Sequence, residues 1–278
     1  MMWNYIVRNL YKILDFLKTD SSWDQWRGCV MSYSIFSGTM ADMTYQEIET
    51  AANEKQLVLF PIAVIEEHGP HLCTGTDTYL TYQFCKDMKN GLFNLGIKAV
   101  IAPPYYWGIN VCTGGFAGSF TIRPETMMSV LCDLLECLKS WGFENIILFN
   151  LHGDFTHTLT IAEAVKAAYE KSGIGAYFIV SEAFLKRSGL SGEPCWIIKP
   201  AGSITDENEP APEYVDIHAG GFETSAMLKN FPELVDREMA QSLKSSRTTQ
   251  EQFKIWAKGG QGAREITPLG YCVAIPRK

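Results

Sequence analysis

Two short apolar runs, each followed closely by acidic and imidazole side chains, decide the fold of this chain. Residues 57–63 read LVLFPIA and lead into EEHGPH at residues 66–71. Residues 145–150 read NIILFN and lead into LHGD at residues 151–154. In an open parallel α/β sheet, the carboxyl ends of the strands face one crevice, where such folds bind ligands. We therefore expect the side chains that follow both runs to meet at one edge of a parallel sheet.

The rest of the chain alternates strand-like and helix-like segments. Thr44 and Glu47 have the spacing of a capping box that opens a short helix, and Pro124 suits the first position of a long helix. The expected helices cover residues 78–90, 124–140 and 158–171, and the further strands cover residues 98–102 and 176–180. This alternation predicts an α/β fold with right-handed crossovers and a mostly parallel central sheet covered by helices on both faces.

The length of 278 residues, 46% of them hydrophobic, suits one large core. We expect a single domain over residues 1–278, with a helical extension at about residues 1–43. Charged residues interrupt the first eighteen residues every few positions, which is typical of an amphipathic helix and not of a signal peptide. No run approaches the roughly 18 apolar residues that a membrane span needs. We therefore expect a cytoplasmic protein without a membrane partner.

Charge and cysteine usage restrict the class of partner. The formal net charge is −7 and no run of lysine or arginine is present, which argues against nucleic acid and for a small-molecule substrate. The eight cysteines form no CxxC pair, so we expect them to be reduced and mostly buried. Cys73 lies within the histidine-containing loop and has a second interpretation as a reactive thiol.

The side chains after the two apolar runs have the chemistry of metal ligands. Only one residue separates Glu66 from His68, so an extended backbone would point both side chains the same way. Imidazole and carboxylate groups suit zinc, manganese or iron, and a carboxylate can bridge two cations. The predicted site, for one or two divalent ions per chain, draws on Glu66, His68, Asp77, His152, His218 and Glu223.

Other interpretations stay open for several segments. Any single buried histidine is often a hydrogen-bonded structural residue; we expect this of His157, while His71 either orients its loop or supports a ligand. Residues 105–121 are rich in glycine and aromatic residues and form either a substrate pocket or a loop that covers the sheet. Residues 192–217, with four prolines and Trp196, are expected to form a lid or an intersubunit arm.

Three motifs resemble those of the creatininase (creatinine amidohydrolase) family. They are EEHGPHL at residues 66–72 with Thr76 and Asp77, NLHGD at residues 150–154, and HAGGFETS at residues 218–225. The resemblance extends from about residue 44 to residue 228. It implies a three-layer α/β/α metallohydrolase that binds one or two divalent metals. It also implies a homo-oligomer, since members of the family are often hexameric.

The same resemblance assigns metal ligands. It makes Glu66, His68, Asp77 and His152 ligands, with Asp77 as the candidate bridge between two ions. Asp154 stands where creatininase has a glutamate that binds the second metal, so Asp154 is a further candidate ligand.

The resemblance also suggests catalytic roles. Glu223 is either a ligand or the base that acts on bound water, and His218 donates a proton or polarises the substrate carbonyl. Two departures from the family pattern alter the pocket beside His152: Leu151 replaces a glycine and Phe155 replaces an asparagine. These changes argue against creatinine itself as the substrate.

Together these expectations predict a divalent-metal-dependent hydrolase that opens a small ring by attack of metal-activated hydroxide on a ring carbonyl. The broken bond is the C–N bond of a cyclic amide or a C–C bond of an oxidised inositol ring, which are both chemistries found in the family. One alternative is a deformylase or amidase acting on an exocyclic C–N bond. A basic phosphate pocket would distinguish it, with Arg123 and Lys199 as isolated candidates. Another alternative is a noncatalytic metal-binding protein, against which the thiolate-poor ligand set argues.

Overall fold

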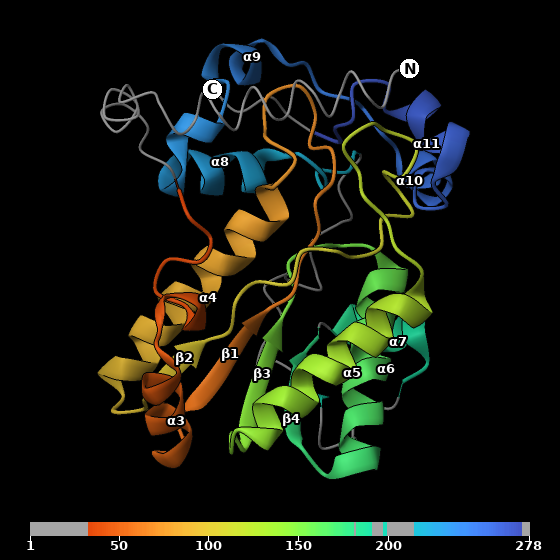
Figure 1. The fold of residues 1–278 in the computed structure, drawn as a ribbon. Coiled ribbons are helices and arrows are strands. Elements are labelled where there is room, and N and C mark those ends of the chain that lie inside the picture. The colour runs from red at the N-terminus through yellow and green to blue at the C-terminus, as the bar shows by residue number, and fades with distance from the viewer. Residues whose placement is uncertain (1–32, 181, 191–196, 199–213, 274–278) are drawn as a thin grey trace, which may run out of the picture. The chain divides into compact units, whose positions relative to one another are not determined.

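The computed structural model describes residues 33–180, 182–190, 197–198 and 214–273 (Figure 1). The chain divides into two compact units, Met1–Ser34 and Ile35–Lys278, and every element described below belongs to the second unit. The amphipathic helix expected in the first eighteen residues lies outside the described residues. The predicted boundary of the N-terminal extension therefore stays a prediction. No helix among the described residues has the length and apolar character needed to cross a membrane.

The described part of the chain contains a five-stranded, all-parallel sheet in the order β2-β1-β3-β4-β5. Val58 pairs with Val100 on one side and with Ile146 on the other, so β1 lies between β2 and β3. The strands are short and apolar, as expected for a parallel sheet whose two faces are both covered. Their bounds are β1 (Leu57–Pro61), β2 (Ala99–Ile101), β3 (Asn145–Phe149), β4 (Gly175–Ile179) and β5 (Ile197–Ile198).

Helices cover both faces of this sheet and make three layers (Figure 1). Helix α4 (Thr76–Asn94) packs on one face, where Cys85 contacts a cluster that includes Leu59. Helices α3 (Tyr45–Asn53), α5 (Pro124–Ser140) and α6 (Phe155–Ser172) pack on the other face, which contains the larger core. The predicted three-layer α/β/α class with a mostly parallel sheet is confirmed.

Local signals placed several element boundaries correctly. Thr44 and Glu47 form both hydrogen bonds of the capping box that opens α3, and α5 begins at Pro124. Helix α6 begins earlier than predicted because the Asp154 side chain accepts a hydrogen bond from the backbone N–H of His157 and caps the helix. Helix α4 is longer at both ends than the predicted range, which was residues 78–90.

The C-terminal part of the chain forms short helices, for which the sequence analysis made no prediction. In Figure 1 the strand arrows point toward the end of this unit where α8, α10 and α11 lie. The elements outside the three layers are η1 (Met40–Asp42), α7 (Glu182–Ser188), α8 (Gly221–Asn230), η2 (Pro232–Leu234), α9 (Arg237–Ser242), α10 (Gln250–Trp256) and α11 (Gly260–Ile266).

Residues 105–121 follow the carboxyl edge of the sheet without regular secondary structure. The backbone N–H of Phe120 donates to the carbonyl of Ile65, and that of Ala63 donates to Tyr105, so the loop is fixed to the segment after β1. Gly108 is needed here because an added Cβ would lie 2.5 Å from the His157 ring. The lid expected at residues 192–217 lies mostly outside the described residues, and so does Trp196.

The prediction that the cysteines are reduced is confirmed for the described residues, and the prediction that they are mostly buried is wrong. All six cysteines in the described residues are free thiols. Only Cys85 and Cys272 are fully buried, while Cys137 is exposed. The remaining three, Cys73, Cys112 and Cys132, are half-buried.

Candidate metal centre

The predicted ligands lie where the strand order changes direction. Because β1 is followed in the sheet by β2 on one side and β3 on the other, the loops after β1 and β3 leave the sheet next to each other. In doubly wound α/β sheets such a switch point at the carboxyl edge forms the ligand crevice. Glu66 and His68 follow β1, and His152 follows β3. The prediction that these segments meet is confirmed.

Helices bring two further acids to the same place. The backbone N–H of Glu66 donates to the carbonyl of Thr74 at 3.0 Å, which closes the loop and returns the chain toward β1. Asp77 then lies in the first turn of α4, where the helix dipole favours a negative charge. Glu223 lies in the first turn of α8. His218, just before that helix, is held by an isolated antiparallel bridge to Cys272.

One group of ligand atoms is formed by Glu66, Asp77 and His152. The Nδ1 atom of His152 lies 2.9 Å from Oε1 of Glu66 and 3.1 Å from Oδ2 of Asp77. All three residues are buried. Two carboxylates and one imidazole within this distance form a candidate site for one divalent cation.

A second group is formed by His68, Asp77 and Glu223. The Nε2 atom of His68 lies 3.5 Å from Oδ1 of Asp77 and 3.9 Å from Oε2 of Glu223. Asp77 therefore directs one oxygen toward His152 and the other toward His68. This arrangement is the one that a bridging carboxylate between two metal ions requires.

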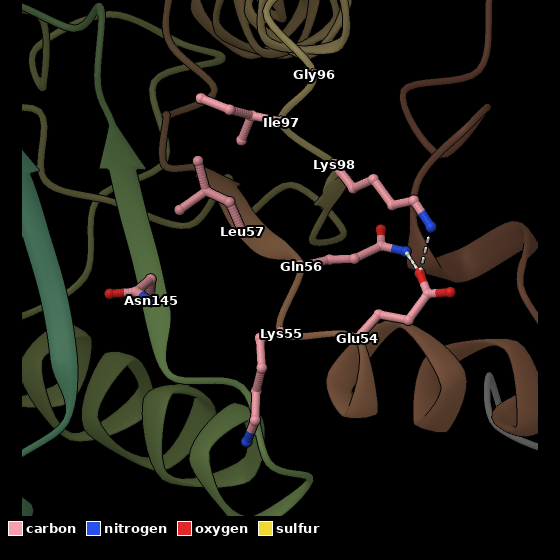
Figure 2. A pocket seen from close by; sticks show the side chains of 8 residues that line it. All are labelled: Glu54, Lys55, Gln56, Leu57, Gly96, Ile97, Lys98 and Asn145. Carbon is pink, nitrogen blue, oxygen red and sulfur yellow. Dashed lines mark hydrogen bonds and ion pairs between the residues drawn. The ribbon is translucent and has the colours of Figure 1, made fainter.

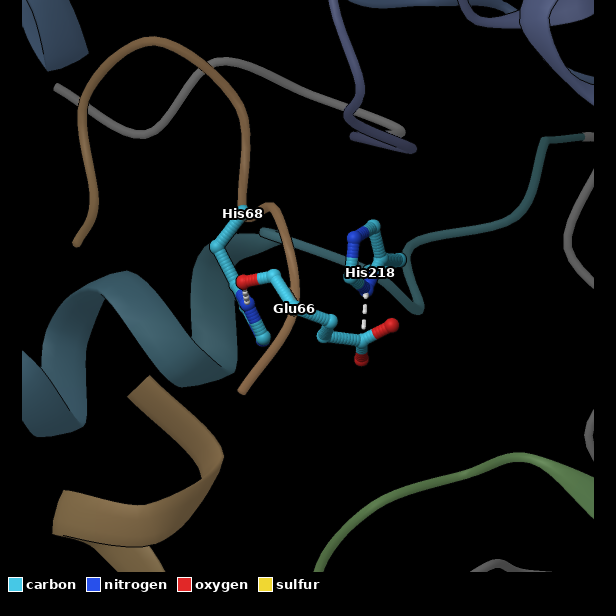
Figure 3. A group of neighbouring side chains, drawn as sticks. All are labelled: Glu66, His68 and His218. Carbon is cyan, nitrogen blue, oxygen red and sulfur yellow. Dashed lines mark hydrogen bonds and ion pairs between the residues drawn. The ribbon is translucent and has the colours of Figure 1, made fainter. Parts of the chain in front are cut away.

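A third group joins the two sides through Glu66, His68 and His218 (Figure 3). Nδ1 of His218 lies 3.8 Å from Oε1 of Glu66, and the rings of His68 and His218 are 4.6 Å apart between centroids. The three groups share residues, so they describe one candidate binuclear centre. His218, to which the family resemblance gave a catalytic role, thus also lies within the cluster.

Three of these histidines are oriented by main-chain carbonyls. In each ring, one nitrogen faces away from the cluster and lies close to a main-chain carbonyl oxygen. The distance is 3.1 Å between His68 and Glu66, 3.1 Å between His152 and Ile109, and 2.9 Å between His218 and Glu67. A carbonyl only accepts hydrogen bonds, so this nitrogen carries the proton in the neutral ring. The other nitrogen then presents its lone pair to the carboxylates. Oriented imidazoles of this kind are typical of metal ligands.

The cluster also contains buried polar atoms that need a partner. Within the described residues, Nε2 of His68 and Oε2 of Glu223 are fully buried and make no hydrogen bond. Buried polar atoms are nearly always paired, so a native protein must satisfy these two in another way. A divalent cation between them would do so, and the nitrogen and oxygen donor set suits zinc, manganese or iron.

The acids and imidazoles of the cluster shift one another's proton affinities. Burial alone would lower the pKa of His68, but the nearby carboxylates of Asp77, Glu223 and Glu66 together raise it to about 10. Burial would raise the pKa of Asp77, but the imidazoles of His68 and His152 hold it well below its usual range. Burial raises the pKa of Glu223. Protons on these groups thus offset the negative charge of the buried carboxylates, which a bound cation would offset in their place.

Three residues of the loop at 105–121, none of them named in the sequence analysis, support the candidate centre. The hydroxyl of Thr113 donates a hydrogen bond to Oε2 of Glu66, and the carbonyl of Ile109 orients His152. Ser119 accepts a hydrogen bond from the backbone N–H of Glu67 at 3.0 Å. A threonine or a main-chain carbonyl in a glycine-rich loop has no distinctive sequence pattern, so only the structure identifies these contacts.

Asp154 is not brought into any of the three groups. Its Oδ1 accepts the backbone N–H of His157 at 3.0 Å, and its Oδ2 accepts that of Val111 at 2.9 Å. Both oxygens are therefore used to cap α6 and to hold the loop at 105–121. The geometry gives the predicted ligand role of Asp154 no support.

The remaining candidates also lie outside the groups. His71 faces the hydroxyl of Thr224 at 2.9 Å, which favours its supporting role. His157 is fully buried in α6, where its Nδ1 accepts the backbone N–H of Ile109 at 3.3 Å, as expected for a structural histidine. Cys73 is half-buried in the turn before α4 and belongs to none of the groups of the described residues.

A cavity of about 660 Å³ opens beside the candidate centre. Its volume falls in the range of roughly 300 to 1,000 Å³ that is typical of small-molecule sites. Glu66, Asp77 and Glu223 line one part of it. Apolar side chains line much of the rest: Leu80, Leu151, Phe155, Ile217, Phe222, Phe253 and Trp256. A small molecule in this cavity would touch both the candidate ligands and an apolar wall.

A second pocket, of about 610 Å³, lies at the opposite edge of the sheet (Figure 2). Its residues precede or begin β1, β2 and β3, and none is a histidine or cysteine. Its one acidic residue, Glu54, pairs with Lys98 at 2.9 Å. The groups that could perform chemistry therefore converge at the carboxyl edge and not here.

Comparison with known proteins gives related sequences. A family model described as creatininase, creatinine amidohydrolase, matches residues 41–277. The creatinine amidohydrolase of Pseudomonas putida is 28% identical over 218 residues, which cover 74% of this chain and 75% of the relative. The 3-dehydro-scyllo-inosose hydrolase of Thermotoga maritima is 25% identical over 201 residues, which cover 71% of this chain and 58% of the relative.

Solved structures of creatininase share the fold. A mutant creatininase described as Zn-Zn type aligns with a TM-score of 0.52 at 20% identity, over 77% of this chain and 80% of that chain. A creatininase described as Mn aligns with a TM-score of 0.51 at 21% identity, over 72% and 75% of the two chains. These likenesses concern the fold, while the family model spans most of the sequence, including all candidate ligands. The chain therefore belongs to the creatininase family of hydrolases.

Proposed function

We propose that this protein is a divalent-metal-dependent hydrolase that opens a small cyclic substrate at a ring carbonyl, with two metal ions per chain. One ion would be held by Glu66, Asp77 and His152, and the other by His68, Asp77 and Glu223. The observation that carries this proposal is the orientation of Asp77, whose two oxygens face two different histidines. Zinc and manganese are the expected metals, with iron as a further possibility, because the donors are nitrogen and oxygen atoms.

Bound divalent ions supply Lewis acidity and lower the pKa of a bound water to about 7. The chain's own residues position and protonate the substrate. His218 lines the cavity, and its pKa is raised, despite burial, mainly by Glu66, so it can hold a proton next to the reacting bond. We infer that His218 donates this proton to the leaving atom, while Glu223, if it is not a permanent ligand, accepts a proton from the attacking water. A new C–O bond then replaces the broken ring bond.

The bond broken is the C–N bond of a cyclic amide or a C–C bond of an oxidised inositol ring. The two relatives support one alternative each, because one is a creatinine amidohydrolase and the other is a 3-dehydro-scyllo-inosose hydrolase. Leu151 and Phe155, the two departures from the family pattern, both line the cavity. They make this wall more apolar beside His152, so we expect a substrate other than creatinine.

A deformylase or amidase acting on an exocyclic C–N bond is the second candidate function. It requires a basic pocket for a phosphate. Of the two sequence candidates, Arg123 is the N-cap residue of α5 and does not line the cavity, and Lys199 lies outside the described residues. Arg187 and Lys254 line the cavity instead, which favours keeping this candidate. A purely structural metal site is disfavoured, because such sites are closed and the candidate ligands here adjoin a cavity.

Metal content and turnover test the proposal together. We expect two ions per chain in the wild-type protein by elemental analysis. His68→Ala should lose the second ion and Asp77→Ala both, each with loss of turnover in a screen of cyclic amides, formamides and oxidised inositols. His71→Ala is the matched control, since this histidine shares the motif but lies outside the three groups. Unchanged metal content in His68→Ala and Asp77→Ala would contradict the assignment.

The assembly and location remain proposals of the same kind. We propose a homo-oligomer, a hexamer by resemblance to the family, and light scattering of the purified protein would measure its mass. The cytoplasmic location and the absence of nucleic-acid and membrane partners stay predictions from the sequence.

A further inference from the structure

Two cationic side chains line the cavity beside the candidate metal centre and have no role in the hydrolysis proposed above. Arg187 lies near the end of α7, and Lys254 lies in α10, so they come from segments far apart in the sequence. Both line the cavity that also contains Glu66, Asp77 and Glu223. A substrate in this cavity can therefore contact the metal ligands at one point and a cation at another.

These two cations lack an acidic partner among the described residues. In the part of the chain that the structure describes, no carboxylate lies within ion-pair distance of Arg187 or Lys254. The carboxylates on the cavity wall face the histidines of the candidate centre or, in the case of Asp154, accept two backbone N–H groups. As far as the described residues go, one part of the cavity wall thus carries positive charge without an acidic partner, and another part carries carboxylates that are already engaged.

The position of Arg187 suits recognition of an oxyanion. Its guanidinium carbon lies 4.7 Å from the centroid of the Phe155 ring, a cation–π contact. Stacking on a ring restrains the guanidinium plane but leaves its N–H donors available. A restrained guanidinium can donate two parallel hydrogen bonds to a carboxylate or phosphate, which a lysine cannot do.

The rest of the wall near these cations offers mostly apolar contacts. Leu151, Ile217, Phe222 and Phe253 line the same cavity, with Gln250 as a neutral polar neighbour. Such a wall fits the body of a small ring and provides few competing polar contacts. An oxyanion attached to that ring would find its partners at Arg187 and Lys254.

We propose that Arg187, assisted by Lys254, binds a carboxylate or phosphate group of the substrate, at a distance from the carbonyl that is hydrolysed. The two side chains then determine specificity by selecting anionic rings over neutral ones. This proposal rests on the proposed function, because the same molecule must reach the metal centre.

The test compares an anionic ring with its neutral isostere on the metal-loaded protein. Binding of hydantoin-5-acetate and hydantoin-5-acetamide is measured by titration calorimetry, and opening of both rings is followed in parallel. We expect the wild-type protein to prefer the acetate by about tenfold or more, and Arg187→Met to lose about tenfold of this preference. Arg187→Lys should keep part of it, and Lys254→Met should lose about threefold.

Two controls make the result specific. Lys258→Met removes the same charge next to α10 from a residue that does not line the cavity, and it should leave the preference unchanged. Inorganic phosphate and acetate, used as competitors on the wild-type and Arg187→Met proteins, distinguish the two oxyanions. The competitor that loses more of its effect in Arg187→Met identifies the group that the site recognises.

The outcomes separate this proposal from the proposed function. If the wild-type protein does not distinguish the two probes, or binds neither, the oxyanion site is refuted. If the rings are opened without any dependence on Arg187, the hydrolase proposal stands and the oxyanion site is refuted. If Arg187→Met loses the preference and no ring is opened, the oxyanion site is supported and ring hydrolysis is contradicted.

Discussion

Replacement of Asp154 by alanine distinguishes a structural carboxylate from a metal ligand. Asp154 is only 3% exposed, so water cannot replace the two hydrogen bonds that its side chain accepts from backbone N–H groups. Loss of the N-cap bond to His157 should cost about 1 kcal/mol, and loss of the charged acceptor for Val111 a further ~2 kcal/mol. We therefore expect the free energy of unfolding to fall by about 3 kcal/mol, which corresponds to a decrease in Tm of about 6–12 °C.

The assay uses the protein in two states. Urea and thermal unfolding of chelator-treated protein measure the cap, and elemental analysis of reloaded protein measures the metal. We expect lower stability and an unchanged number of ions. Asp236→Ala is the matched control, because Asp236 caps α9 through Met239 in an exposed setting. It should cost only about 1 kcal/mol.

The opposite result would refute this reasoning. If Asp154→Ala loses one ion per chain while the metal-free protein unfolds at the same urea concentration as the wild type, Asp154 is a ligand. The family pattern would then describe this site better than the hydrogen bonds of Asp154 do.

Two further predictions concern the metal. Thr113→Val removes the hydroxyl that donates to Glu66, and it should weaken metal binding about 10- to 100-fold in competition with a chelator. The control is Thr121→Val in the same loop, which should leave metal affinity unchanged. Equal metal affinities of the two variants would refute the supporting role of Thr113. Metal binding should release protons at pH 7, because His68, with a pKa of about 10, is protonated before an ion binds. The affinity of the protein for zinc should therefore rise with pH up to about 10. Calorimetry of zinc binding in buffers of different ionisation enthalpy would detect the released protons. Zero net proton release would contradict the assigned role of His68.

The parts of the fold that follow from local rules were predictable from the sequence. Apolar runs of five to seven residues placed the main strands, and Pro124 and the capping box at Thr44 placed helix starts. Glu66, His68 and His152 could be joined in advance because parallel strands present their carboxyl ends at one edge. Asp77 needed only a loop flexible enough to return, which its glycines and proline provide.

Other parts depend on contacts that the sequence does not encode locally. Whether the carboxylate of Asp154 faces a metal or caps a helix depends on one side-chain rotation, and both outcomes fit the same residue type. The C-terminal helices were not predicted because they are short and depend on tertiary packing. Trp256 of α10, for example, packs with Val215, Ala263 and Cys272 in a small cluster separate from the main core. Lys254 could therefore not be placed on the cavity wall from the sequence.

The loop at residues 105–121 shows why both interpretations of it were incomplete. The loop covers the sheet edge, as one of the two interpretations predicted. Its main role in the structure, however, is to hold side chains that belong to other segments. Ile109 orients His152 through a carbonyl, Thr113 holds Glu66, and Val111 engages Asp154. These contacts come from both the backbone and a side chain, and they fix residues that follow two different strands. The loop thus couples the positions of Glu66 and His152, so a change in its length should disturb the metal centre before it disturbs the sheet.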